Sequence, residues 1–200
     1  MTNRPFFFAI FWCIASTACP VHAETTFRLS TRNESIPENG VVAYTVLRAD
    51  ENEFVFLPPP QWKSEIDRKA GSLSWTSPDY RCQIQMQVNA GSSNKAPKLN
   101  SEELKRALLA RHKQASILDE FPCYTSGLTG IAFDWERPGE SGFAIRSRSA
   151  FVPITGGTAE LTLSTSRDQF EKRHMDLMRL LNSFRVTTPN PQLSEQKSRP

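Results

Sequence analysis

Apolar and polar residues alternate strictly over residues 80–88, and this is the clearest pattern in the chain. Because successive side chains of a strand point to opposite faces, the alternation predicts a strand with one buried face and one polar face. Cys82 belongs to the apolar face. The polar face is formed by Arg81, Gln83, Gln85 and Gln87.

Three further strands are predicted in the C-terminal half, separated by turns that contain glycine and proline. Their ranges are 130–135, 143–152 and 158–165. Consecutive strands joined by such turns form an antiparallel meander. Short strands are also expected earlier in the chain, at 26–31, 41–47, 54–57 and 73–75.

Two segments have the periodicity of amphipathic helices. The first covers about 100–115, where Asn100 is a capping residue and Glu103 completes a capping box. The second covers about 166–184, where apolar residues from Phe170 to Phe184 recur at steps of three and four.

These elements together predict an α+β fold. We expect an antiparallel β-sheet of about six or seven strands, including the C-terminal three-strand meander, packed against the two main helices. Both helices are expected on one face, which leaves the polar face open. The single domain is expected to cover 24–186. Residues 187–200 contain three prolines and no apolar period, and we expect a disordered tail there.

Residues 1–23 have the order of regions found in a secretory signal peptide. Arg4 gives a basic start, 6–18 are almost entirely apolar, and Ala23 is a small residue suited to cleavage. The apolar run is shorter than the roughly 20 residues that span a bilayer. We therefore expect a periplasmic or secreted protein, most simply in a bacterial envelope. The alternatives are an uncleaved anchor or a buried helix.

A second interpretation of this segment uses Cys19. The stretch Ser16-Thr17-Ala18-Cys19 resembles a bacterial lipoprotein box, in which the cysteine is lipidated and becomes the first residue. The domain would then be tethered to a membrane. No later segment is long and apolar enough for a predicted transmembrane helix.

The net charge of the chain is small and does not indicate that the protein binds a polyanion. The chain has a formal net charge of +3, and residues 1–23 contribute one basic residue and no acid, so the processed chain carries +2. This balance gives no electrostatic case for nucleic-acid binding. Processing leaves two cysteines, Cys82 and Cys123, and export favours a disulfide between them. The alternative is two buried free thiols.

The motif search points to no metal, cofactor or established catalytic centre. His112 and His174 fall on different predicted helices, without the spacing of a zinc site. Asp134 and Glu136 lie two residues apart on one strand, and neighbouring carboxylates can act as general acid and base. Ordinary ion pairs with Arg137, Arg146 and Arg148 are the simpler interpretation of these acids.

The expected open face of the sheet is the main candidate site. It combines the polar residues of the 80–88 strand with Ala144, Arg146, Arg148, Glu160, Thr162 and Ser164. A face rich in glutamine and arginine can hold a partner or a polar ligand through side-chain hydrogen bonds. The alternative is a face that only contacts solvent.

Two stretches carry a family resemblance over about residues 40–186. The sequence Phe-Val-Phe-Leu-Pro-Pro-Pro-Gln-Trp at 54–62, and the closing strand and helix at 161–186, resemble PsbP/DcrB-like proteins. The resemblance implies a small exported binding or assembly domain, usually without catalysis, and it carries over no functional residue.

The leading hypothesis is therefore an exported, non-catalytic binding or assembly domain of the cell envelope. Its partner would be an unknown protein or envelope component. One alternative is an envelope hydrolase that uses Asp134 or Glu136. Another is a membrane-tethered lipoprotein anchored through Cys19.

Overall fold

The computed structural model describes residues 27–37, 40–49, 52–91, 95–139 and 142–187. The expected signal peptide at 1–23, Cys19 and residues 188–200 of the expected tail lie outside these ranges. Among the helices of the described part, none combines the length and the apolar character needed to cross a bilayer.

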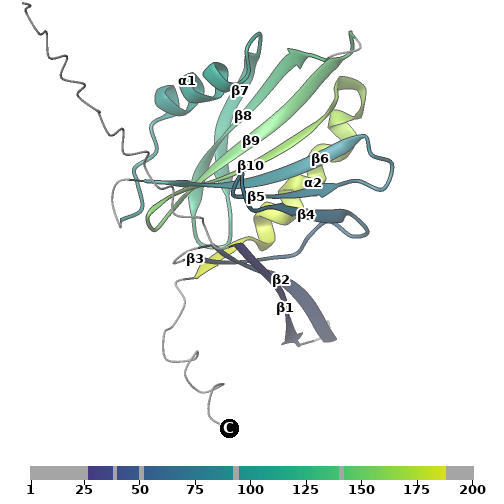
Figure 1. The fold of residues 1–200 in the computed structure, drawn as a ribbon, viewed down its shortest axis with the longest axis vertical. Coiled ribbons are helices and arrows are strands. Elements are labelled where there is room, and N and C mark those ends of the chain that lie inside the picture. The colour runs from purple at the N-terminus through teal and green to yellow at the C-terminus, as the bar shows by residue number, and fades with distance from the viewer. Residues whose placement is uncertain (1–26, 38–39, 50–51, 92–94, 140–141, 188–200) are drawn as a thin grey trace, which may run out of the picture.

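The larger of two antiparallel sheets has seven strands in the order β4-β5-β6-β10-β9-β8-β7 (Figure 1). In that order the strands are Lys63–Asp67, Ser72–Thr76, Cys82–Ala90, Gly157–Ser166, Ala144–Ile154, Thr129–Pro138 and Ser116–Tyr124. The predicted meander corresponds to β8, β9 and β10, and β7 adds a fourth consecutive strand to it.

The smaller sheet has four strands in the order β1-β2-β3-β11. These strands are Phe27–Ile36, Gly40–Ala49, Asn52–Phe56 and Arg185–Thr187. The described residues thus hold eleven strands in two sheets, not about six or seven in one. The α+β class is confirmed, whereas the number of sheets and strands is corrected.

The two helices begin close to their predicted starts. Helix α1 covers Ser101–Arg111, and the Asn100 side chain caps it by accepting hydrogen bonds from the backbone N–H groups of Glu102 and Glu103. A short 3-10 turn, Arg167–Gln169, leads into α2, which covers Phe170–Ser183.

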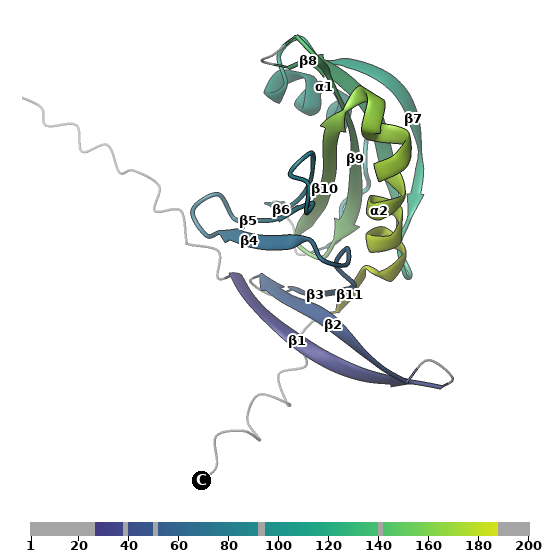
Figure 2. The same ribbon diagram turned by 90° about the vertical axis from the view of Figure 1, so that its right-hand side faces the viewer.

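The helices lie on opposite faces of the seven-stranded sheet, so the expectation that both cover one face is wrong (Figure 2). Helix α2 packs its apolar stripe into the main core. Helix α1 places Leu108 against Phe133, Trp135 and Phe151 on the other side. The β8–β9 pair has apolar residues on both faces, and each face therefore takes a helix.

The main core fills the space between the larger sheet, α2 and the smaller sheet. Phe56 contacts Trp75 of β5 edge to face at 5.3 Å between ring centroids, and it stacks on Phe184 at 6.2 Å. These rings join three parts of the chain that are far apart in sequence. We call the face toward this core the α2 face and the opposite face the α1 face.

Cys82 and Cys123 are buried free thiols, so the predicted disulfide is not formed. Cys82 lies on β6 and Cys123 on β7, with three strands between them in the sheet. Neighbouring strands are about 4.8 Å apart, so the cysteines are separated by about 19 Å along the sheet. A disulfide requires Cα atoms within about 7 Å of each other.

Candidate functional site

The α1 face of the larger sheet is polar across its centre. Cross-strand registers place Gln83 beside Ser164 and Ser147, and Gln85 beside Thr162 and Ser149. In Figure 2 the strands β4 to β6 run across the direction of β8 to β10, so the sheet is bent. Helix α1 lies over one end of this face.

A cavity of about 300 Å³ lies on this face. Its floor is formed by glutamines of β6 and hydroxyl and carboxylate residues of β10, and its wall by β8 and the end of α1. The lining residues are Gln83, Gln85, Gln87, Arg111, His112, Trp135, Arg137, Glu160, Thr162 and Ser164. Each of these side chains carries at least one hydrogen-bonding group.

A second cavity of about 430 Å³ continues from the first. It shares Gln83, Arg137 and Ser164 with the first cavity and adds Tyr80 and Arg81 at its far end. We call the two cavities together the polar trough. Because Arg137 lines both, its side chain lies where they join.

The hydroxyl groups of the trough floor are held in a hydrogen-bond network. The Trp135 indole donates to Ser149 Oγ at 3.0 Å, and Ser149 Oγ lies 2.7 Å from Thr162 Oγ1. Ser147 and Ser164 pair in the same way at 2.9 Å. Each side chain is therefore fixed by its neighbours, and a ligand would meet a preorganised surface.

The α1 end of the trough contains a buried ion pair and a stacked histidine. Arg111 binds Glu160 at 2.9 Å, and the Glu160 side chain is only 5% exposed. His112 stacks on Trp135 at 4.4 Å between centroids. Burial lowers the pKa of His112, and the charges of Arg111 and Arg137 lower it further. Burial and the two arginine charges thus favour the neutral imidazole of His112, and the Glu160 charge opposes them.

The other end of the trough is a rigid turn that displays an aromatic ring. Tyr80 is 79% exposed and has a φ of 58°, which is uncommon outside glycine. Its N–H donates to the Ser77 carbonyl, and the Ser77 hydroxyl donates to Asp79 at 2.6 Å. Hydrogen bonds from Ser77 and the Arg81 backbone, with the Arg173 charge, lower the pKa of Asp79 to about 2.

The predicted site residues separate into two groups. Arg81, Gln83, Gln85 and Gln87 line the trough, together with Glu160, Thr162 and Ser164. Arg146 and Arg148 lie on the α2 face instead, where they align with Thr165 and Leu163 of β10. The expected single face is therefore wrong for these two arginines. Both faces of β9 carry polar residues, and only its pairing with β8 and β10 decides which residue points where.

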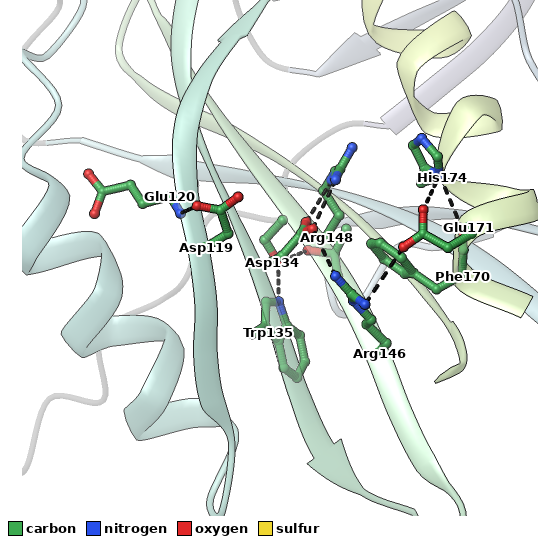
Figure 3. Close-up of polar contacts among 11 residues, drawn as sticks. Asp119, Glu120, Asp134, Trp135, Arg146, Arg148, Phe170, Glu171 and His174 are labelled. Carbon is green, nitrogen blue, oxygen red and sulfur yellow. Dashed lines mark hydrogen bonds and ion pairs between the residues drawn. The ribbon is translucent and has the colours of Figure 1, made fainter. Parts of the chain in front are cut away.

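Arg148 and Arg146 converge on Asp134 beneath α2 (Figure 3). Arg148 binds both carboxylate oxygens of Asp134, and Arg146 approaches it at 3.6 Å. The Arg146 guanidinium also lies 4.4 Å from the centre of the Phe170 ring. These contacts secure the start of α2 against the sheet.

This arrangement gives no support to the hydrolase alternative. The Asp134 side chain is 5% exposed and paired with Arg148, and Glu136 is paired with Arg167 at 3.0 Å. Neither acid lines the trough, nor the two further cavities at Pro58–Pro60 and beside α1. In the described part of the chain, no three His, Cys, Asp or Glu residues gather as metal ligands would.

Several trough residues were missed by sequence reasoning, namely Tyr80, Arg111, His112, Trp135 and Arg137. Tyr80 was assigned to the buried face of its strand, but it precedes β6 in a turn. Phe133, Trp135 and Arg137 are alternate residues of β8, so the sequence itself places their side chains on one face of the strand. Only the position of α1 on that face identifies it as the trough side.

Comparison with solved structures finds similar folds at low sequence identity. Cyanobacterial PsbP from Synechocystis matches with 10% identity and a TM-score of 0.47, over 86% of this chain and 99% of that protein. A Pseudomonas aeruginosa protein of unknown function, described as a putative regulator, matches with 16% identity and a TM-score of 0.43, over 74% of this chain and 98% of its own.

A Bacteroides thetaiotaomicron protein matches over 70% of this chain with 13% identity and a TM-score of 0.46, and the match spans 46% of that protein's length. No protein-family model matches the sequence, and neither does any curated protein. A PsbP protein is thus among the similar structures, as the sequence resemblance leads one to expect. Identities of 10–16% assign no function and no site residue.

Proposed function

We propose that this protein is a non-catalytic binding domain of the cell envelope and that its partner lies in the polar trough. The observation that carries this proposal is the pair of adjoining cavities on an open, polar sheet face. A concave site with several convergent polar groups is the usual form of a ligand site. The acids that would serve catalysis are instead paired with arginines on the opposite face.

The trough glutamines are also separate from the side chains of the main core. The main core lies on the α2 face, whereas Gln83 and Gln85 stand on the trough side of β6. Substitutions at these two positions can therefore change binding without removing core packing. This separation makes the proposed function directly testable.

The test uses a photoreactive phenylalanine analogue placed at Gln85 and, as a control, at Lys172 on the exposed side of α2. Cross-linking in the native cell envelope should give one discrete adduct from position 85 and none of the same mass from position 172. Adding Gln83→Glu should abolish the adduct. Adducts that are the same from both positions, or that persist with Gln83→Glu, would contradict a trough partner.

Export remains part of this proposal, because it rests on the sequence of residues 1–23. The mass of the protein isolated from its native cell distinguishes the alternatives. Cleavage after Ala23 leaves Glu24 as the first residue, whereas lipidation leaves a modified Cys19. An intact N-terminus in the cytosol would contradict an envelope location.

A further inference from the structure

We propose that the polar trough recognises an extended acidic peptide segment, whose carboxylates bind Arg81 and Arg137. This inference rests on the proposed binding function and names its ligand class. Arg81 and Arg137 line the same 430 Å³ cavity, and Arg137 lies where this cavity joins the one that Glu160 lines.

The charges in the trough favour an anionic ligand. Three arginines line the two cavities, and among the described residues the one carboxylate that lines them is Glu160. Glu160 is buried and already neutralised by Arg111. Arg81 and Arg137 therefore make the lining of the 430 Å³ cavity positive, and the Asp168 carboxylate outside this lining interacts with the Arg81 charge.

Arg137 is the better placed of the two for a carboxylate. Its Nε is buried and finds no hydrogen-bond acceptor among the described residues. Its Nη1 donates to the Pro138 carbonyl over 3.4 Å, which is long for such a bond. The planar guanidinium presents paired N–H donors that match the two oxygens of a carboxylate. Because that Nε is buried, a ligand carboxylate would approach the Nη groups of the guanidinium.

The glutamine row favours a peptide as the carrier of that carboxylate. Gln83, Gln85 and Gln87 occupy alternate positions of β6, so their side chains repeat about every 6.8 Å. An extended peptide repeats its backbone groups over the same two-residue distance. Each glutamine amide has both donors and an acceptor, as needed to pair with backbone C=O and N–H. A peptide lying along β6 would therefore stay in register with the row.

The Tyr80 turn closes the same end of the trough. Its exposed ring is carried by a backbone that Ser77, Asp79 and Arg173 hold in place. A rigid aromatic side chain contributes contact area at low conformational cost. Arg81 is the residue after Tyr80. The Tyr80 ring can therefore contact the methylene groups of a ligand side chain whose carboxylate binds Arg81.

The probe is a ten-residue peptide of alternating threonine and glutamate, compared with its threonine–glutamine isostere. Binding is measured by isothermal titration calorimetry on the wild-type protein, on Arg81→Gln/Arg137→Gln, and on Arg28→Gln/Arg179→Gln. The last variant removes the same charge at two exposed positions outside the trough. All three proteins are first compared by thermal unfolding.

We expect the glutamate peptide to bind the wild type at least about tenfold more tightly than the glutamine peptide. The trough variant should lose at least about tenfold in affinity, and the control should change by less than about twofold. Equal binding of the two peptides, equal loss in both variants, or no binding by the wild type would overturn the inference.

Two further results separate this inference from the function on which it rests. Tighter binding of a tetragalacturonate, which carries carboxylates on a sugar chain, would overturn the peptide class. If the trough cross-links its partner at position 85 but binds no acidic peptide, the ligand class is wrong and the binding function stands. If neither is observed, both proposals fail.

Discussion

Arg148 donates two hydrogen bonds to Asp134 across the β8–β9 pair, from Nε to Oδ1 at 2.6 Å and from Nη2 to Oδ2 at 2.9 Å. The same guanidinium lies 4.7 Å from the centre of the Phe121 ring and 5.5 Å from that of Phe170. The pair thus links β7, β8, β9 and α2 at one point beneath the helix.

Replacing Asp134 with asparagine should lower the free energy of unfolding by about 3 kcal/mol, because Arg148 would keep its buried charge without a counter-ion. Urea unfolding followed by circular dichroism measures the change. The control is Glu171→Gln, whose side chain is 75% exposed and whose ion pairs should contribute less than about 1 kcal/mol. Equal effects of the two variants would mean that the Asp134 pair is not structurally important.

Gly130 is a position where any side chain would collide with its neighbours. A β-carbon there would overlap the Phe151 carbonyl oxygen and lie 2.8 Å from Cys123 Sγ. We expect Gly130→Ala to destabilise the protein by about 2–3 kcal/mol through forced displacement of β8 or β9. Gly40→Ala is the control, because a β-carbon at Gly40 would meet no neighbouring atom. Its φ of +75° is unfavourable for alanine and should cost about 1 kcal/mol. A smaller effect at Gly130 than at Gly40 in urea unfolding would contradict this.

The two buried thiols should be almost unreactive in the native protein. Burial raises the pKa of Cys82 to about 12 and that of Cys123 to about 11, from an ordinary value of 9.0. Only the thiolate reacts, so alkylation at pH 8 should be at least about 100-fold slower than in the unfolded chain. Peptide mapping at each cysteine measures the rates. A disulfide-linked peptide containing both residues would contradict the free-thiol state.

The raised pKa values of the two thiols also predict that stability decreases at high pH. A raised thiol pKa means that the native state keeps a proton that the unfolded chain loses above pH 9.0. This contribution to stability is complete below pH 9.0 and is lost as the pH rises through about 11 to 12. The stability of Cys82→Ala should therefore fall less steeply than that of the wild type over this range.

The Tyr80 turn should depend on the ionisation of Asp79. Because the folded pKa, about 2, is below the ordinary value of 3.8, the carboxylate stabilises the fold above pH 3.8, and this contribution is lost as the pH falls through 2. The carboxyl carbon of Asp79 should titrate near 2 by NMR. Since the Ser77 bond is the largest cause of the shift, Ser77→Ala should move the midpoint upward. A wild-type midpoint near 3.8 would contradict the turn geometry.

Local signals in the sequence predicted their elements well. The alternation over 80–88 became β6, and Asn100 caps α1 through two backbone N–H groups. The stripe from Phe170 onward became α2. Each of these patterns depends on residues within a few positions of each other, and this is the range over which a single sequence is informative.

The missed elements depend on partners far away in the sequence. Strand β7 carries Asp119, Glu120 and Pro122, and it is recognisable only as the edge of the sheet, where a proline costs no ladder hydrogen bond. Strand β11 has three residues and exists because β3 pairs with it. The separation of Cys82 from Cys123 likewise follows from the order of the strands, and their spacing in the sequence does not reveal it.

Only part of the candidate site could be predicted, because the rest depends on strands that pair across long distances in the sequence. The glutamines of β6 show their face by strict alternation, and the structure places them in the trough. Arg146 and Arg148 belong to β9, which carries polar residues on both faces. Ser147 and Ser149 are the polar residues of the other face. The sequence of β9 alone therefore cannot assign its faces, and the cross-strand register has to do so.

The alternation of faces along β6 and β10 has a practical consequence for protein engineering. Every second residue of these strands faces the interior, and the intervening residues face the trough. A combinatorial library confined to Gln83, Gln85, Gln87, Thr162 and Ser164 would diversify one continuous surface while every interior side chain of both strands is retained. The domain is thus a natural scaffold for selecting new recognition specificities.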